Sequence, residues 1–226
     1  NLVVASAYSI EASADKIVRV FAPNSDKVMQ ECAGHTHPAT ALAWSHDGRS
    51  LISGSADRNL ILWNLETGKP LKTFAAIHDV VTVAISPDGR RLIFSATDAA
   101  GVSQLWMREL SSDVVRPLAL TQGAIQPFWA PDSEQIAYFQ DGALKILILS
   151  SGISRTVCRV SPGPRRGSWG AQGDILVAAR DLPIQRVSQN GGTPQSVTTL
   201  EPGDPNTQHF YPSFLPDGER FLFAVA

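Results

Sequence analysis

The sequence predicts an all-β protein with a β-propeller architecture, and three observations lead to this fold class. A polar turn between two apolar runs recurs five times, anchored on positions 47, 88, 132, 172 and 217. Between the anchors lie intervals of 41, 44, 40 and 45 residues, each with room for four short strands. A repeat of about 40–45 residues with four strands is typical of a propeller blade. No stretch shows helical periodicity with caps.

The polar turn separates the first strand of each unit from the second. In three of the five copies it contains Asp-Gly, as in Asp88-Gly89. Because this dipeptide tolerates positive φ, we expect it at the centre of a two-residue hairpin. Pro87, just before it, cannot donate to a strand ladder and therefore ends the preceding strand.

Three further strands follow from apolar runs and turns within each unit. Second strands are predicted at Leu51–Ser55, Leu92–Ser95, Gln135–Phe139 and Ile175–Ala179. Third strands are predicted at Leu60–Trp63, Gln104–Met107, Leu144–Ile148 and Ile184–Val187. Fourth strands are predicted at Leu71–Phe74, Val114–Leu118, Arg155–Val160 and Gln195–Leu200. Lys, Arg and Gln in the fourth strands indicate an exposed outer edge.

The repeats predict one domain over residues 1–226 with five blades. Complete units lie near 40–85, 81–123, 124–164 and 165–207, and residues 1–39 and 208–226 are expected to share a closing blade. Such closure would cover sheet edges and favour a monomer. Leu2–Ala5 and Phe221–Val225 both suit the second-strand position of that blade, so a fragment of a parent with six to eight blades is the alternative.

The composition limits the classes of partner. The chain is 43% hydrophobic and 18% charged, with 19 Lys and Arg against 21 Asp and Glu. These values argue against general disorder and against a dominant nucleic-acid footprint. No apolar run is long enough to insert in a membrane. Cys32 and Cys158 have no metal-ligand or redox spacing and do not identify a compartment.

One segment carries a family resemblance. Gly34-His35, the run from Leu51 to Asp57, and Leu62-Trp63-Asn64 together resemble one WD-repeat blade. The resemblance implies a buried hydrogen-bonded tetrad of His35, Ser53 or Ser55, Asp57 and Trp63. Asn64 stands where the family has Asp. Ser13 to Phe21 echoes the same blade 42 residues earlier, with Phe21 in place of the Trp.

The later units resemble a second type of repeat. Ser86 to Phe94, followed by Gln104-Leu105-Trp106, is similar to TolB-like propeller repeats. Phe128 to Ser133 and Phe214 to Gly218 are of the same type. Such repeats often form the sensor half of bacterial serine/threonine kinases. The change of type implies a natural mixed propeller or a chimera.

No motif predicts catalysis. The chain lacks a nucleophile elbow, a phosphate loop, a dinucleotide fingerprint and a zinc-protease helix, so we expect no catalytic residue, metal or cofactor. His35 and Asp57 could be a base and its orienting acid, but the repeat explains both as members of the tetrad.

The first functional hypothesis is therefore a non-catalytic module that binds a protein or peptide through its loops. The expected binding face holds His37, His78, Arg165, Arg166 and His209, and Tyr211 on an innermost strand could line a ligand site. Arg165 and Arg166 form the clearest basic cluster, suited to a carboxylate or phosphate. A ligand-sensing domain of a signalling protein is the alternative, and a propeller hydrolase or lyase is a third.

Overall fold

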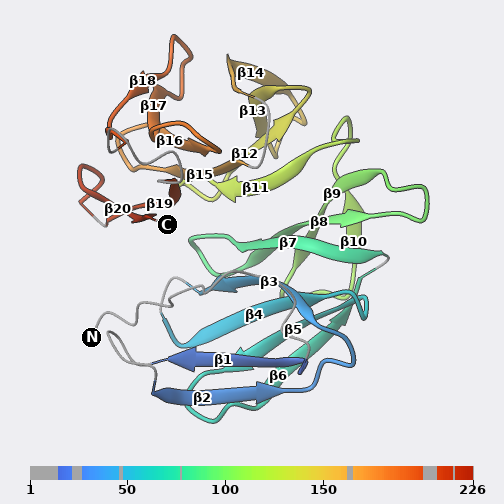
Figure 1. Ribbon diagram of the computed structural model, residues 1–226. Helices are drawn as coiled ribbons and strands as arrows, with labels where there is room; N and C mark the ends of the chain where they lie inside the picture. Colours follow the sequence, from blue (N-terminus) through green and yellow to red (C-terminus); the bar gives the residue numbers. More distant parts are fainter. Residues whose placement is uncertain are drawn as a thin grey trace. The chain divides into compact units, whose positions relative to one another are not determined.

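The structure is a computed structural model, and it describes residues 15–21, 27–45, 48–76, 78–161, 165–200, 208–215 and 217–225. Every helix or strand assigned in these residues is a β-strand, and all the strand pairs are antiparallel (Figure 1). Among the described residues, no helix has the length and apolar character needed to cross a membrane. The predicted run Leu2–Ala5 lies outside the described residues.

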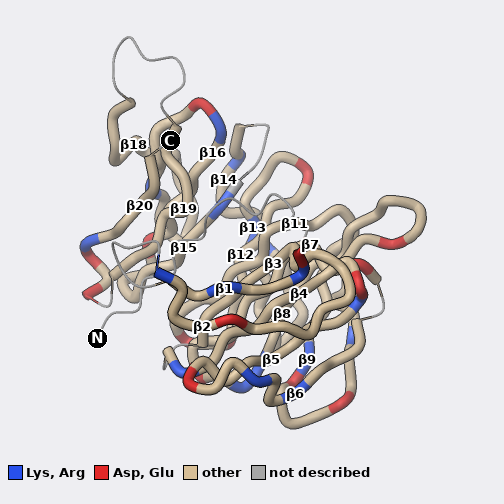
Figure 2. The backbone as a smooth tube through the Cα atoms, turned by 60° about the horizontal axis from the view of Figure 1, so that its bottom comes forward, with Lys and Arg blue, Asp and Glu red and all other residues tan. Residues whose placement is uncertain are grey.

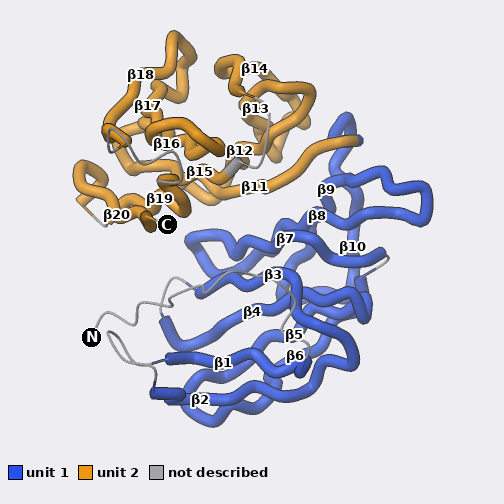
Figure 3. The backbone as a smooth tube through the Cα atoms, in the orientation of Figure 1, with its two compact units in different colours: residues 1–122 blue, residues 123–226 orange. Residues whose placement is uncertain are grey.

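The chain divides into two compact units, residues 1–122 and 123–226 (Figure 3). Each unit is built from sheets whose strands follow one another in chain order. The closing blade predicted from residues 1–39 and 208–226 would draw on both units. That blade and the organisation of the chain as one domain stay predictions.

The first unit holds one two-stranded sheet and two four-stranded sheets. The two-stranded sheet consists of β1 (Ile17–Phe21) and β2 (Val28–Ala33). The next sheet contains β3 (Ala39–Trp44), β4 (Ser50–Ser55), β5 (Asn59–Asn64) and β6 (Pro70–Ala75). The third contains β7 (Asp79–Ile85), β8 (Arg91–Thr97), β9 (Ser103–Glu109) and β10 (Val115–Pro117).

The second unit holds two four-stranded sheets and one two-stranded sheet. Its first sheet contains β11 (Ile125–Trp129), β12 (Gln135–Gln140), β13 (Ala143–Ile148) and β14 (Ser154–Arg159). Its second contains β15 (Arg165–Trp169), β16 (Asp174–Ala179), β17 (Gln185–Ser188) and β18 (Gln195–Ser196). The last pair is β19 (His209–Phe214) and β20 (Phe221–Val225).

These sheets confirm the prediction of four-stranded antiparallel blades. Two fourth strands are shorter than predicted, because β10 covers Val115–Pro117 and β18 covers only Gln195–Ser196. Pro117 has no N–H to donate, which limits the ladder at that edge. Just after each short strand, one backbone hydrogen bond still joins the chain to the third-strand segment. Leu118 N–H donates to the Leu105 carbonyl and Val197 N–H donates to the Ile184 carbonyl, both at 2.8 Å.

The turns between first and second strands are longer than the expected two-residue hairpins. In the β7–β8 connection, Ser86 N–H donates to the Arg91 carbonyl at 2.9 Å and Gly89 N–H donates to the Ser86 carbonyl at 2.8 Å. The positive φ falls on the glycine alone, at +70° for Gly89. Asp88 instead accepts a hydrogen bond from Arg90 N–H at 3.0 Å. The aspartate therefore closes the turn with its carboxylate, and the glycine supplies the left-handed backbone.

The core lies between neighbouring sheets within each unit. In the first unit Ile52, Phe74, Leu92 and Phe94 belong to one buried cluster that draws on both four-stranded sheets. A Cβ built on Gly54 would lie 2.4 Å from Val80 Cγ1, so these sheets meet with their backbones close together. A second buried cluster joins the two four-stranded sheets of the second unit. Blades packed face to face explain why the second strands are apolar on both sides.

Candidate recognition surface

Four side chains from one blade of the first unit form a buried hydrogen-bonded chain. His35 comes from the β2–β3 loop, Ser53 from β4, Asp57 from the β4–β5 turn and Trp63 from β5. Trp63 Nε1 donates to Ser53 Oγ at 2.8 Å, and His35 Nε2 lies 2.6 Å from the same oxygen. His35 Nδ1 lies 2.9 Å from Asp57 Oδ2. Ser55 is outside this chain, since its hydroxyl donates to the carbonyls of His37 and Pro38.

Asp57 is the charged end of this hydrogen-bonded series of side chains. Its side chain is 2% exposed, and burial alone would raise the pKa of its carboxyl. Hydrogen bonds from Thr36 N–H, His35 and Asn59 N–H outweigh burial, so the net pKa is lower than the ordinary value of 3.8. The Thr36 bond is 2.8 Å long and the Asn59 bond 2.9 Å. One carboxylate therefore fastens the β2–β3 loop to the β4–β5 turn.

The connectivity of Ser53, His35 and Asp57 matches that of a Ser-His-Asp catalytic triad. Burial distinguishes this arrangement from a working catalytic triad. Ser53 is 0% exposed, the His35 side chain is also 0% exposed, and the Ser53 hydroxyl already accepts the indole N–H of Trp63. A nucleophile must reach its substrate, so this arrangement serves structure in the conformation observed.

The loop held by Asp57 presents His37. This side chain is exposed, and its Nδ1 lies 3.2 Å from Thr36 Oγ1. His78 occupies the β6–β7 connection and is half-buried. Its ring meets Trp106 edge to face, with 6.1 Å between the ring centroids. Of these two histidines, His37 is thus the more accessible for contact with a partner.

The other four predicted binding residues lie in the second unit, on the first strands β15 and β19. Arg166 Cζ lies 5.4 Å from the centroid of the Tyr211 ring, and Tyr211 is 39% exposed. His209 is 5% exposed, bonds Thr198 Oγ1 through Nδ1 at 2.8 Å and packs on Phe223. Arg165 pairs with Ala179 in the β15–β16 ladder, and its side chain lies outside the described part.

The structure therefore brings two of the predicted residues, Arg166 and Tyr211, into contact and buries a third, His209. The contact between Arg166 and Tyr211 was not predicted from the sequence. The sequence does contain a signal for this contact, because the two residues stand 45 positions apart, the same interval as between the last two turn anchors. Equivalent positions of neighbouring repeats lie side by side when first strands are adjacent.

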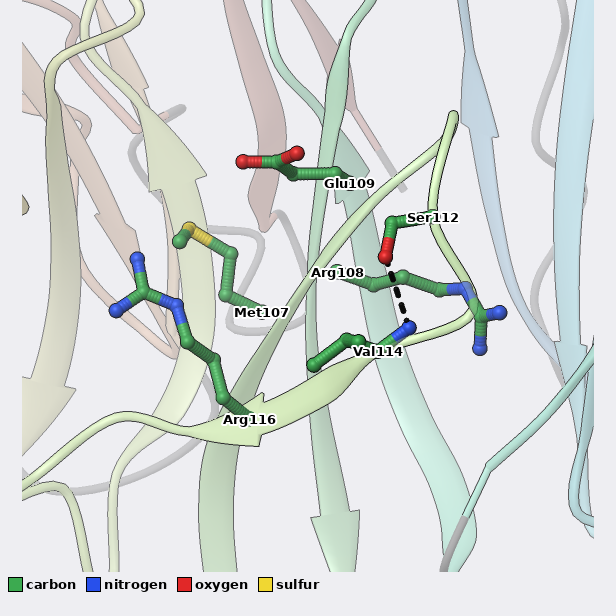
Figure 4. A pocket seen from close by; sticks show the side chains of 6 residues that line it. All are labelled: Met107, Arg108, Glu109, Ser112, Val114 and Arg116. Atoms are coloured by element: carbon green, nitrogen blue, oxygen red, sulfur yellow. Dashed lines mark hydrogen bonds between the residues drawn. The ribbon is translucent and has the colours of Figure 1, made fainter.

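A separate pocket of about 290 Å³ lies beside β9 and β10 in the first unit (Figure 4). Its lining residues are Met107, Arg108, Glu109, Ser112, Val114 and Arg116. Met107, Glu109 and Arg116 point to one side of the strand pair, and Arg108 points to the other. Ser112 Oγ accepts a hydrogen bond from Val114 N–H at 3.0 Å. The pocket thus mixes charges of both signs with apolar groups and contains no nucleophile beside a base.

Charges elsewhere are dispersed. Figure 2 shows Lys and Arg positions scattered among Asp and Glu positions along the strands and turns of both units. Across the described residues, no group of three or more His, Cys, Asp or Glu side chains is arranged to hold a metal ion.

Comparison with known proteins identifies the repeat of the first unit. Residues 26–64 match the family described as "WD domain, G-beta repeat". Human WD repeat-containing protein 36 is 30% identical over 110 residues, covering 44% of this chain and 12% of that protein. Autophagy-related protein 16 of Arabidopsis thaliana is 28% identical over 152 residues, covering 64% of this chain and 29% of that protein. Human striatin is 34% identical over 80 residues, covering 32% of this chain and 10% of that protein.

The fold is similar to that of a solved structure, the β-propeller domain of Cps50 (Swd1) from Myceliophteria thermophila. The TM-score is 0.70 at 16% sequence identity, with 94% of this chain and 74% of that chain covered. The matched segments span between about a tenth and three tenths of the length of the three sequence relatives, all of which are eukaryotic. The chain has a β-propeller fold, and its residues 26–64 match a WD-repeat family.

Proposed function

We propose that this chain is a non-catalytic scaffold that binds a protein or peptide partner. The observation that carries the proposal is the buried chain of His35, Ser53, Asp57 and Trp63. The groups best suited to acid, base and nucleophilic chemistry are hydrogen-bonded to one another and closed to solvent. The similarity to WD-repeat proteins supports the same reading.

The physical consequence of the buried chain is a rigid loop. Asp57 ties Thr36 and His35 to the β4–β5 turn, so the exposed His37 is presented from a fixed backbone. Binding residues on loops that a rigid scaffold positions lose little conformational entropy when they meet a partner. This loop in the first unit and, separately, the surface of Arg166 and Tyr211 in the second unit are the two regions that we would test first for contacts.

The experiment is a selection from a displayed library of short peptides, with the folded chain as bait and the urea-denatured chain as control. We expect enrichment of a shared motif on the folded chain only. Enriched peptides should lose affinity on replacement of His37 or Arg166. The parallel assay measures turnover of generic ester and phosphate substrates. Enrichment of no peptide, or a turnover that Ser53→Ala abolishes in a folded protein, contradicts the proposal.

Three finer predictions stay proposals. The first is a five-bladed ring, closed by strands from residues 1–39 and 208–226. The second is the TolB-like and bacterial character of the later blades, with the ligand-sensing role that it implies. The third is that nucleic acids and membranes are not partners, which rests on the formal net charge of -2 and on the lack of an apolar span. Partner identity from the peptide selection distinguishes a sensor from a scaffold.

A further inference from the structure

The first strands of the second unit lie side by side. β15 contacts β11 on one side and β19 on the other (Figure 1). Arg166 on β15 and Tyr211 on β19 meet across this row, with the guanidinium carbon 5.4 Å from the ring centroid. A guanidinium that lies on an aromatic face keeps the N–H groups at its edge free for a second partner.

Neighbouring strands hold β15 in place on both sides of Arg166. A Cβ built on Gly167 would lie 2.3 Å from Phe128 Cε1, so the β15 backbone packs directly on the Phe128 ring of β11. On the opposite side, Phe214 N–H of β19 donates to Ser168 Oγ at 3.1 Å. The backbone that carries Arg166 is thereby pre-organised, which lowers the entropy lost when a ligand binds.

Tyr211 has a left-handed backbone conformation. Its φ is +51°, in the left-handed region, and it precedes Pro212 at an irregularity in the β19–β20 ladder. A residue before proline avoids helical backbone conformations, so the surrounding structure must hold Tyr211 in this one. The result is a ring that is 39% exposed and stays beside the guanidinium. Gln126, which precedes Pro127 in β11, has the same conformation with a φ of +52°, so two first strands of this unit share this irregularity.

The charge around Arg166 is not balanced locally. β11, β15 and β19 contain two arginines and neither Asp nor Glu. Some other arginines of this unit have carboxylate partners, such as Arg186 with Asp174 at 3.6 Å and Arg220 with Asp217. Within the described ranges, the Arg166 guanidinium contacts the Tyr211 ring, and no Asp or Glu pairs with it. Among the described residues, its charge therefore has no acidic partner.

We propose that Arg166 and Tyr211 form a recognition site for a carboxylate side chain of an acidic peptide. This proposal rests on the proposed function and names the chemistry of the partner. The planar guanidinium can donate two parallel hydrogen bonds to a carboxylate. The exposed face and edge of Tyr211 suit the methylene groups of a Glu side chain. A nucleic acid is less suited, because its affinity requires several cations along a phosphate backbone and these strands offer two.

Two synthetic fluorescent peptides test the site, one with Glu at alternating positions and its counterpart with Gln at the same positions. Fluorescence anisotropy measures binding to the complete chain. We expect the Glu peptide to bind at least about tenfold more tightly, because hydrogen bonds to a charged partner are stronger than those to a neutral one. Arg166→Ala should remove most of this preference. Arg166→Lys keeps the charge but loses the planar pair of N–H donors, so it should retain only part of the preference for the Glu peptide.

Control variants separate site effects from folding and bulk charge. Arg180→Ala removes an exposed arginine of the same unit, whose side chain is 62% exposed, and should leave the Glu preference unchanged. Tyr211→Leu tests the ring, and unfolding curves confirm that each variant folds. A single-stranded oligothymidylate is the third probe, and preferential binding of this probe through Arg166 overturns the proposal.

Three results overturn the proposal: no detectable binding of the Glu peptide, equal binding of the Glu and Gln peptides, or an Arg166→Ala variant that keeps the full preference. The proposed function fails by a different result, the enrichment of no peptide in the library selection. A selection that enriches neutral or basic peptides would support the scaffold function and contradict the acidic-peptide site.

Discussion

The guanidinium of Arg108 lies on the ring of Phe74, with its Cζ 4.4 Å from the ring centroid. Arg108 faces Leu92 in the β8–β9 ladder, as Trp63 faces Leu51 in the β4–β5 ladder. An arginine therefore occupies in one blade the register position that the buried tryptophan holds in the preceding blade. Arg108 is 4% exposed, and its Nε is buried without a hydrogen-bond partner.

Replacement of Arg108 should separate packing from charge. Arg108→Ala should lower the free energy of unfolding by about 2–5 kcal/mol, because it leaves a cavity beside Phe74. Arg108→Met keeps most of the volume and removes a desolvated charge. The ion pair that it breaks, with Asp113 at 3.0 Å, involves a carboxylate that is 87% exposed and contributes little, so the variant should be neutral or stabilising. Urea denaturation measures both, with the exposed Arg116→Met as the control. A loss in Arg108→Met as large as that in Arg108→Ala would show that the charge itself stabilises the blade.

The two tryptophans of the first unit's third strands should respond differently to the loss of the indole N–H. Trp63→Phe removes the donor to Ser53 Oγ and should cost about 1–3 kcal/mol beyond any packing loss. Trp106 Nε1 is buried with no hydrogen-bond partner, so Trp106→Phe serves as the matched control. Its cost should be smaller, and thermal unfolding of both variants checks the difference. Equal costs would contradict a stabilising role for the Trp63–Ser53 bond.

Asp57 should make stability depend on acid pH. Its pKa is lower in the folded chain than the ordinary value of 3.8, so folding favours the ionised form. The resulting stabilisation is present above about pH 4 and is lost as the pH falls through the folded pKa. Asp57→Asn should be less stable at neutral pH and should lose less stability between neutral and acid pH. The exposed Asp181→Asn is the control, and urea unfolding over a pH series is the measurement.

The contact of Gly167 with Phe128 should show a specific coupling. Gly167→Ala places a methyl group 2.3 Å from the ring, so it should cost about 1–3 kcal/mol through overpacking. Phe128→Leu makes room, and the double variant should be less destabilised than the sum of the two single changes. A double-mutant cycle by denaturation measures this coupling. Strict additivity would mean that the two strands do not meet as closely as described.

Closure of the chain into one domain predicts its size in solution. A compact monomer of this length should have a radius of gyration of about 17 Å. Light scattering gives the mass and small-angle X-ray scattering gives the radius. An oligomer or a markedly larger radius would contradict a closed monomeric ring and would favour an open fragment.

Much of the fold was predictable because its signals are local. The apolar runs Gln135–Phe139 and Phe221–Val225 reappear within one residue as β12 and β20. The WD-repeat resemblance also implied Ser53 or Ser55 as the partner of His35. The two residues are two positions apart in β4, so strand alternation places both on the same face and could not decide between them. Both hydroxyls are buried, and the Ser53 oxygen is the one that meets His35 and Trp63.

The remainder depended on contacts that a sequence does not show. Asp-Gly specified a left-handed glycine but not the loop length around it. His209 was placed on a loop face because it follows a loop-like stretch, whereas Thr198 and Phe223, distant in sequence, hold its ring in the interior. Arg166 and Tyr211 meet because two first strands are neighbours, and comparison of the repeats by position is what would have paired them.

We propose that Ser53, His35 and Asp57 stabilise the blade and take no part in catalysis. The most direct test is the intact mass of the folded chain after treatment with a fluorophosphonate, which reacts with activated serine nucleophiles. We expect an unchanged mass, because Ser53 is fully buried and its hydroxyl is bonded to Trp63 and His35. A stoichiometric adduct at Ser53 in the folded protein would contradict a purely structural role and would show that Ser53 is an activated nucleophile.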